Sequence, residues 1–241
     1  IIENPRGQVN ATADNAVCAG SPVSAAFTTT NTGGSTTYSW TNTNTAIGLA
    51  ASGTGNISFT STNTTNAPIQ GEIAVTPTYT ANGVSCVGTT DTFIVTVNPK
   101  PVIQNSTPAI CSGDAFTVTP ANSGATIVPA NTTYTWTIKT DNANITGKSA
   151  QSTAQSTFTQ TLKNTTNTPT AIVYTLTPKS GTCTGTTFDL TVTVNPTPEI
   201  QNSTAETCSG DAFTVAPANT GATIVPLNTT YTWTISTNTN L

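Results

Sequence analysis

Apolar and polar residues alternate along most of the chain with a period of two, which is typical of β-strands that bury one face. Threonine, present 60 times, fills many of the polar positions, and its branched Cβ favours extended backbone. Clusters of Gly, Pro, Asn and Ser separate these runs, and no window has the period of a helix. The clearest apolar faces lie in the middle of the chain and comprise Phe116/Val118, Tyr134/Trp136/Ile138, Phe158/Leu162, Ile172/Tyr174/Leu176 and Phe188/Leu190/Val192/Val194.

The whole pattern returns with a period of 97 residues. Residues 99–144 and 196–241 are identical at 33 of 46 aligned positions, and residues 1–98 are a more diverged copy. We therefore predict repeat 1 at 1–98, repeat 2 at 99–195 and the first half of a repeat 3 at 196–241. A repeat of this length with about seven strands predicts an antiparallel sandwich of two sheets. The expected fold class is all-β, with tandem seven-stranded sandwiches arranged as a rod.

Proline-rich links join the repeats. Each complete repeat ends in Val-Asn-Pro-x-Pro, as at 97–101 and 194–198. Two prolines one residue apart hold the backbone extended, so we expect short, semi-rigid links. The third copy stops just after its Tyr-x-Trp strand, and the chain contains no Met. We expect the chain to be a processed or excerpted piece of a longer tandem array.

Charge and residue types narrow the possible functions. Only 7% of the residues are charged and the net charge is -4, so nucleic-acid binding is not expected. No apolar run is long enough to insert into a membrane. The chain has no His, the commonest general base and metal ligand, and its ten acidic residues are scattered. We expect no catalytic residues, no cofactor and no metal site.

The five cysteines follow the repeat. Each complete repeat has one Cys before its first core strand and one in a late loop: Cys18 with Cys86, and Cys111 with Cys183. Cys208 is the first member of a third pair, whose partner we expect outside the chain. Bridges within each repeat are favoured because such weakly hydrophobic domains need internal stabilisation. The alternative pairs Cys86 with Cys111 and Cys183 with Cys208. Either pairing implies an oxidising compartment.

Aromatic and acidic residues are the remaining candidates for binding sites. The six core positions expected from the strand pattern are Tyr38, Trp40, Tyr134, Trp136, Tyr231 and Trp233. Exposed tryptophans could instead stack on carbohydrate, but these lie in mid-strand on the face of other apolar residues. Asp114 and Asp211 follow a repeated Cys-Ser-Gly and could bind calcium. Calcium needs six to eight oxygen ligands, so a role in the turn is the favoured interpretation.

Four motifs resemble known surface proteins. The order Cys111, Tyr134-x-Trp136, Cys183 is similar to an immunoglobulin-like (Ig-like) domain. Ala-Ile-Cys-Ser-Gly-Asp at 109–114, Gly-Thr-Cys at 181–183 and Thr-Val-Thr-Val-Asn-Pro at 191–196 resemble the PKD-like repeats of giant Bacteroidota cell-surface adhesins. Within that family the resemblance is to the gliding-motility adhesins exported by the type IX secretion system. It implies an extracellular location at the cell surface, attached to the outer membrane or secreted.

These observations predict a non-catalytic repeat segment of a large adhesin that acts in attachment, with gliding motility as the finer expectation. Its expected partners are the neighbouring repeats of the same long chain and surface polysaccharide or another substratum. Many weak contacts along such an array would add through their effective concentration. The alternative is a spacer array in a secreted enzyme that degrades polysaccharide or protein. Glycosylation of the many threonines is a further hypothesis.

Overall fold

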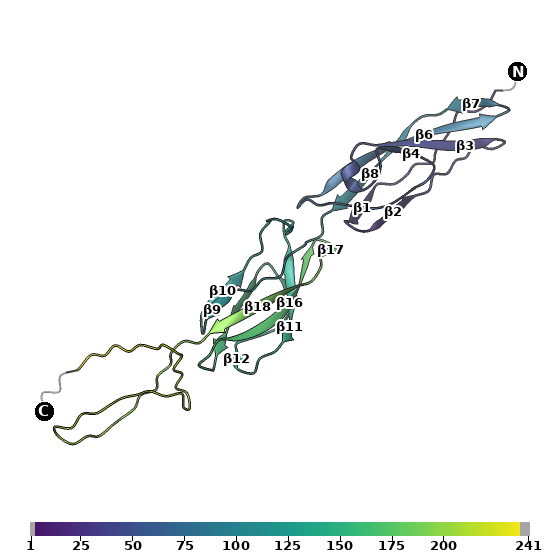
Figure 1. Cartoon of the computed structure of the whole chain (residues 1–241). Coiled ribbons are helices and arrows are strands. Elements are labelled where there is room, and N and C mark those ends of the chain that lie inside the picture. Colours follow the sequence, from purple (N-terminus) through teal and green to yellow (C-terminus); the bar gives the residue numbers. More distant parts are fainter. Residues whose placement is uncertain (1–2, 237–241) are drawn as a thin grey trace. The chain divides into compact units, whose positions relative to one another are not determined.

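The structure is a computed structural model that describes residues 3–236. Residues 1–2 of the predicted repeat 1 and 237–241 of the predicted repeat 3 lie outside the described residues. The fold is all-β, and its sheets have a sandwich-like arrangement (Figure 1). This confirms the predicted fold class. The described chain contains one short helix, and no helix in it is long and apolar enough to span a membrane.

The chain divides into two compact units. The first contains the residues up to Ile103 together with Pro120–Thr133 and Thr177–Thr187, and the second contains Gln104–Thr119, Tyr134–Leu176 and the residues from Phe188 onward. The units therefore do not follow the repeat boundaries predicted from the sequence, which stay a prediction.

The strands of the first repeat form one large sheet and one ribbon. The sheet has the order β1-β8-β6-β3-β4, with β7 paired to the end of β6, and the ribbon pairs β2 with β5. The elements are β1 (Asn15–Cys18), β2 (Pro22–Ala25), β3 (Ser35–Asn42), η1 (Thr45–Ile47), β4 (Ser52–Thr54), β5 (Ile57–Thr60), β6 (Ile69–Ala81), β7 (Val84–Val87) and β8 (Asp91–Asn98).

The second repeat has the same plan. Its large sheet has the order β13-β11-β16-β18-β9 with β17 paired to β16, and two ribbons pair β10 with β14 and β12 with β15. The strands are β9 (Ala109–Cys111), β10 (Ala115–Val118), β11 (Thr133–Thr140), β12 (Ile145–Thr146), β13 (Gln151–Gln155), β14 (Phe158–Thr161), β15 (Lys163–Asn164), β16 (Thr170–Ser180), β17 (Cys183–Thr184) and β18 (Phe188–Asn195).

Two details differ from the expected seven antiparallel strands. Among the described residues the first repeat has eight strands and the second has ten; in the first, the long strand β6 continues beyond β8 and pairs there with β7. In addition, the first strand of each repeat pairs in parallel with the last one, β1 with β8 and β9 with β18. Strand β1 leads directly into β2 of the ribbon, so it joins the large sheet only briefly at its edge.

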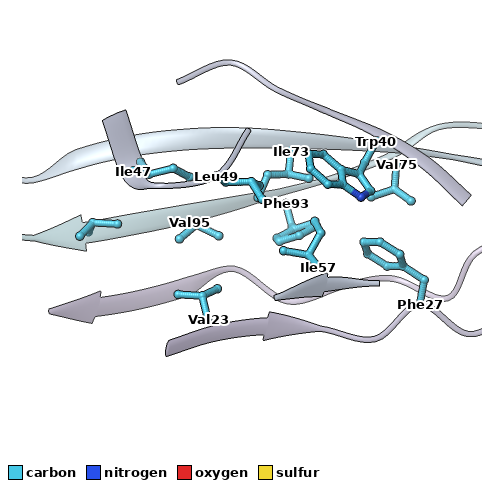
Figure 2. Close-up of a cluster of buried hydrophobic side chains, with 11 residues drawn as sticks. Val23, Phe27, Trp40, Ile47, Leu49, Ile57, Ile73, Val75, Phe93 and Val95 are labelled. Carbon is cyan, nitrogen blue, oxygen red and sulfur yellow. The ribbon is translucent and has the colours of Figure 1, made fainter. Parts of the chain in front are cut away.

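The core of the first repeat lies between its large sheet and its ribbon. Figure 2 shows Val23 pointing toward Val95, and Phe27 lying beneath Trp40 and Val75. Ile73 and Val75 are fully or almost fully buried, because alternate residues of β6 face the core. The period-two pattern of the sequence is therefore the pattern of burial.

The residues of the third copy do not form a comparable core. Between residues 196 and 236 the described chain has no strand of more than one residue, and a single bridge joins Glu199 to Ile224. Large apolar side chains are exposed there, among them Phe213, Leu227 and Ile235. The described part of the third copy therefore lacks the second half of the sequence that completes a sandwich in repeat 2.

Candidate functional site

A disulfide joins Cys18 to Cys183. Their Cα atoms lie 5.5 Å apart and 165 residues separate them in the sequence. Cys183 is 1% exposed, so the bond is largely shielded from solvent. Both residues belong to the first compact unit, although Cys18 comes from repeat 1 and Cys183 from repeat 2 of the sequence.

This bond corrects both pairings considered from the sequence. Cys86, Cys111 and Cys208 are free thiols, so neither Cys18–Cys86 with Cys111–Cys183 nor Cys86–Cys111 with Cys183–Cys208 is present. The predicted partner of Cys208 outside the chain stays a prediction. Disulfide formation itself, expected from the cysteine pattern, is confirmed.

Strand register gives the physical reason in repeat 1. Cys18 lies beside Asn98 at the end of β8, where the chain leaves the repeat. Cys86 lies beside Tyr79 of β6, while Ile69 at the other end of β6 is opposite Val97. Ten residues of strand therefore separate the two positions, which is about 33 Å. A disulfide requires Cα atoms within about 7 Å.

We name these two positions by where they lie in a repeat. The outgoing end is the end of the last strand, which holds Cys18 in repeat 1 and, beside Asn195, Cys111 in repeat 2. The incoming end is the opposite one, which holds Cys86 and Cys183 in their hairpins. The observed disulfide thus joins the outgoing-end cysteine of one repeat to the incoming-end cysteine of the next.

A tight turn holds the outgoing-end cysteine. The Ser21 N–H donates to the Cys18 carbonyl at 3.0 Å, and Gly20 takes a positive φ of 83°. The buried Ser61 hydroxyl also donates to the Cys18 carbonyl, at 3.0 Å. Cys18 is therefore fixed by backbone contacts that do not depend on the disulfide.

Four of the six predicted core aromatics lie in or against a core. Trp40, Trp136 and Tyr134 are buried, and Tyr38 is half-buried against Phe27. The core position is wrong for the other two in this structure, because Tyr231 is 44% and Trp233 83% exposed. The strands that cover Trp136 come from residues 145–195, and the chain has no third copy of that segment.

Acidic residues do not gather into a site. Asp114 and Asp211 occupy the turns after Cys111 and Cys208, and their backbone N–H groups donate to those cysteines' carbonyls at 3.3 and 3.1 Å. Within residues 3–236, no three acidic, Cys or His side chains come close enough to hold a metal ion. Hydrogen bonds from Lys148 and Lys139 lower the pKa of Asp141 and Asp189, respectively. Such exposed ion pairs contribute little stability.

Sequence reasoning missed a buried asparagine that recurs in both repeats. The Asn164 side chain is fully buried and donates to the Val194 carbonyl at 2.9 Å and to the Thr168 carbonyl at 2.8 Å. Its Oδ1 accepts from the Thr166 N–H and hydroxyl at 2.9 and 2.8 Å. Asn63 makes the equivalent four contacts in repeat 1. The signal was the motif Asn-Thr-Thr-Asn-x-Pro at 63–68 and 164–169.

Replacing this asparagine should loosen the second repeat. Asn164→Ala removes these four hydrogen bonds and takes the side-chain partner from the Thr166 N–H and the Val194 carbonyl, at a cost of about 3 kcal/mol. Native-state hydrogen exchange of β18 should then be roughly a hundredfold faster. The matched control is Asn167→Ala, because Asn167 belongs to the same motif but is exposed. Equal exchange in the two variants would contradict the role assigned to Asn164.

A buried tyrosine makes the second repeat sensitive to alkali. Tyr174 is fully buried, its hydroxyl has no hydrogen-bond partner, and its ring lies 4.9 Å from that of Phe158. Burial, with a smaller contribution from the charge of Asp141, raises the pKa of Tyr174 to about 12. The neutral form is therefore favoured in the fold, relative to an ordinary tyrosine pKa of about 10.

The sign of the pH effect follows from this raised pKa. The stability linked to neutral Tyr174 is fully present below about pH 10 and is lost as the pH rises toward about 12. Urea unfolding across this range should show the loss in the parent chain. Tyr174→Phe cannot ionise, so its alkaline loss should be smaller. A Phe variant with the same alkaline loss as the parent would contradict this assignment.

Residues 108–198 match the family model of the PKD-like domain. That match covers most of the second repeat and supports the resemblance seen in its motifs. No curated protein matches the chain.

Several solved structures are similar in part. The D00-D0 domain of intimin has a TM-score of 0.36 and 15% identity, over 76% of this chain and 98% of that one. The N-terminal four Ig domains of Dscam1 isoform 4.4 have a TM-score of 0.35 and 8% identity, over 82% of this chain and 47% of that one. EC22-24 of mouse cadherin-23 has a TM-score of 0.34 and 14% identity, over 80% of this chain and 65% of that one.

Proposed function

We propose that this chain is a non-catalytic repeat segment of a large extracellular adhesin, in which it serves as a disulfide-linked stalk. The observation that carries the proposal is the bond between Cys18 and Cys183, which fastens two sequence repeats that a proline-containing link already connects. A covalent bond between repeats is suited to a chain that bears tension. Disulfides persist in oxidising compartments, which supports an extracellular location.

Three further features support a stalk rather than a catalyst. The second repeat matches a PKD-like domain. Its tryptophan is buried and its recurrent polar side chain, Asn164, uses its hydrogen bonds to hold backbone within the same repeat. The charged residues are few, so salt should have little effect on a stalk of this kind.

The finer proposal concerns the use of the stalk. We infer attachment to surface polysaccharide or another substratum, with export by the type IX secretion system and a role in gliding motility. The support is the resemblance of the repeat motifs to those of such adhesins. Weak contacts repeated along an array would add to a strong attachment without a deep binding pocket in any one repeat.

The test is to label producing cells with an antibody raised against residues 99–195. Gold particles on filaments outside the outer membrane, together with loss of attachment when the antibody is added, would support the adhesin. A second arm follows movement of the labelled cells on glass. Antigen found only in the medium, joined to a catalytic domain, would overturn the proposal. Antibody against an unrelated surface protein is the control for steric effects.

A further inference from the structure

Each kind of cysteine lies in the same local surroundings in the copies of the repeat that contain it. In the turn of repeat 2, the Gly113 N–H donates to the Leu162 carbonyl at 2.8 Å, as the Gly20 N–H does to the Ser61 carbonyl at 2.7 Å in repeat 1. Gly113 has a φ of 89°, close to the 83° of Gly20. Cys111 is thus presented as Cys18 is, but it is exposed and free.

The third copy presents its cysteine in the same kind of turn. The Asp211 N–H donates to the Cys208 carbonyl at 3.1 Å, and Gly210 has a φ of 89°. Positive φ is readily available only to glycine, so Cys-x-Gly encodes this turn locally. The turn therefore forms even where no complete sandwich surrounds it.

The incoming-end cysteines also match each other. Each lies two residues before a glycine whose N–H donates to a proline carbonyl of the long strand, Gly88 to Pro77 at 2.8 Å and Gly185 to Pro178 at 2.9 Å. The arriving chain passes directly over these glycines. A Cβ on Gly88 would lie 1.7 Å from the Gly7 carbonyl oxygen, and one on Gly185 would lie 2.1 Å from that of Pro101.

We infer that the bond between Cys18 and Cys183 is one step of a repeating linkage. In this linkage the outgoing-end cysteine of each repeat is oxidised with the incoming-end cysteine of the next repeat. Cys111 is then the bonding position for a repeat that follows, and Cys86 for a repeat that precedes. Cys86 and Cys111 remain free in this structure because neither has a matching neighbour among the described residues.

The register within a repeat excludes the competing linkage. Cys111 lies beside Asn195, and Val194 is opposite Thr170 at the start of β16. Cys183 lies beside Ser180, ten residues along that strand, which is again about 33 Å away. A repeat therefore cannot close on itself and can bond only to its neighbours.

The chemistry is an ordinary oxidation of two thiols. The two cysteines form one S–S bond and lose two protons and two electrons. These reduce the disulfide of an oxidant, here oxidised glutathione, to two thiols. No metal or cofactor is required.

Successive links of this kind overlap along the chain. The loop closed by Cys18 and Cys183 contains Cys111, so a link from Cys111 to a following repeat starts inside the loop before it. Residues 111–183 would then lie within two closed loops. An array built in this way would stay in one piece after any single cut in the overlapping region. This deepens the proposed function by adding a covalent path for tension, but its test does not depend on attachment.

The experiment supplies the missing neighbour. A copy of residues 145–195 is appended after Leu241, which aligns with Asn144, so that the third repeat is complete. The extended chain is oxidised with a mixture of reduced and oxidised glutathione, the free thiols are blocked, and the product is digested with chymotrypsin without reductant. Cleavage after aromatic residues and Leu leaves each cysteine on its own peptide. The appended copy alone carries Thr182→Ser, so that its cysteine peptide differs in mass from the otherwise identical peptide 177–188 that holds Cys183. Mass spectrometry then identifies the pairs.

We expect two linked pairs: Cys18 with Cys183, and Cys111 with the cysteine that the appended copy carries at the position of Cys183. Cys86 and Cys208 should be recovered as blocked thiols. As a control, Cys183→Ser in the appended copy alone should return Cys111 to the blocked thiols and leave the first pair intact.

The inference is overturned by either of two results. One is a Cys111 that stays free, or bonds to Cys86 or Cys208, while Cys18 and Cys183 are linked. The other is a chain in which Cys18 and Cys183 themselves fail to pair. Failure of the first pair would remove the disulfide from the proposed stalk, and failure of the second would not. Attachment is tested separately on cells, so failure here and failure of the adhesin can be told apart.

Discussion

A chain cut once between Thr89 and Thr90 should remain a single molecule until it is reduced. Both residues are exposed in the turn before β8, where an inserted recognition sequence for a site-specific protease should be tolerated. The cut separates Cys18 from Cys183 on the two fragments. In a denaturing gel without reductant, the disulfide should hold the fragments together, and reductant should release both.

The position of the cut makes this result decisive. It lies between Cys86 and Cys111, so bonds within each repeat would leave the two fragments unconnected. A bond between Cys86 and Cys111 would hold them, but it would also hold them in the Cys18→Ser variant. We expect Cys18→Ser to separate completely without reductant, and Cys86→Ser to behave like the parent. Fragments that separate without reductant in the parent chain would contradict the observed pairing.

Much of the fold could be predicted because the burial pattern is local. Alternation along β16 places Ile172, Tyr174 and Leu176 on one face, and all three are buried in the structure. The same phase correctly placed Trp40 and Trp136 in their cores. The alternation of buried and exposed residues depends only on the strand itself. The Gly, Pro, Asn and Ser residues between the strands predicted the turns.

The disulfide could not be predicted because it depends on which strands are neighbours. Cys18 is placed at the outgoing end by the parallel pairing of β1 with β8, and period-two alternation says nothing of strand direction. The regular spacing of the cysteines also conceals short insertions and deletions between the two repeats. Trp40 and Trp136 are 96 residues apart, whereas Asn63 and Asn164 are 101 apart.

The buried asparagine was missed for a related reason. Asn164 lies in a segment that reads as a polar loop, and one of its partners is the Val194 carbonyl, 30 residues away. Its two nearer partners, Thr166 and Thr168, make a tight local turn that resembles many exposed Asn-Thr turns in this chain. Only its repetition at Asn63 distinguishes it, and that comparison requires the offset of 101 residues.

The exposed aromatic residues of the third copy lead to a prediction about a chain in which that copy is completed. In repeat 2, the Trp136 ring lies 4.8 Å from that of Phe158, and its Nε1–H donates to the Ser149 carbonyl at 2.9 Å. Tyr134 contacts Phe188 with ring centroids 6.4 Å apart. All three covering residues lie in 145–195. Trp233, the counterpart of Trp136, has no such cover and is 83% exposed.

Appending a copy of residues 145–195 after Leu241 should therefore bury Trp233. Burying one large aromatic side chain stabilises a fold by a few kcal/mol, about 25 cal/mol per Å². We expect the amides of residues 229–236 to change from rapid hydrogen exchange to the slow exchange of residues 132–139, and acrylamide quenching of the tryptophans to fall. The control carries Phe158→Ala in the appended copy alone, which removes the ring that should pack on Trp233. If residues 229–236 are protected from hydrogen exchange in the extended chain and less protected in this control, a repeat is completed by its own second half. Exchange at 229–236 as rapid as in the 241-residue chain would contradict the equivalence of the third copy and the second.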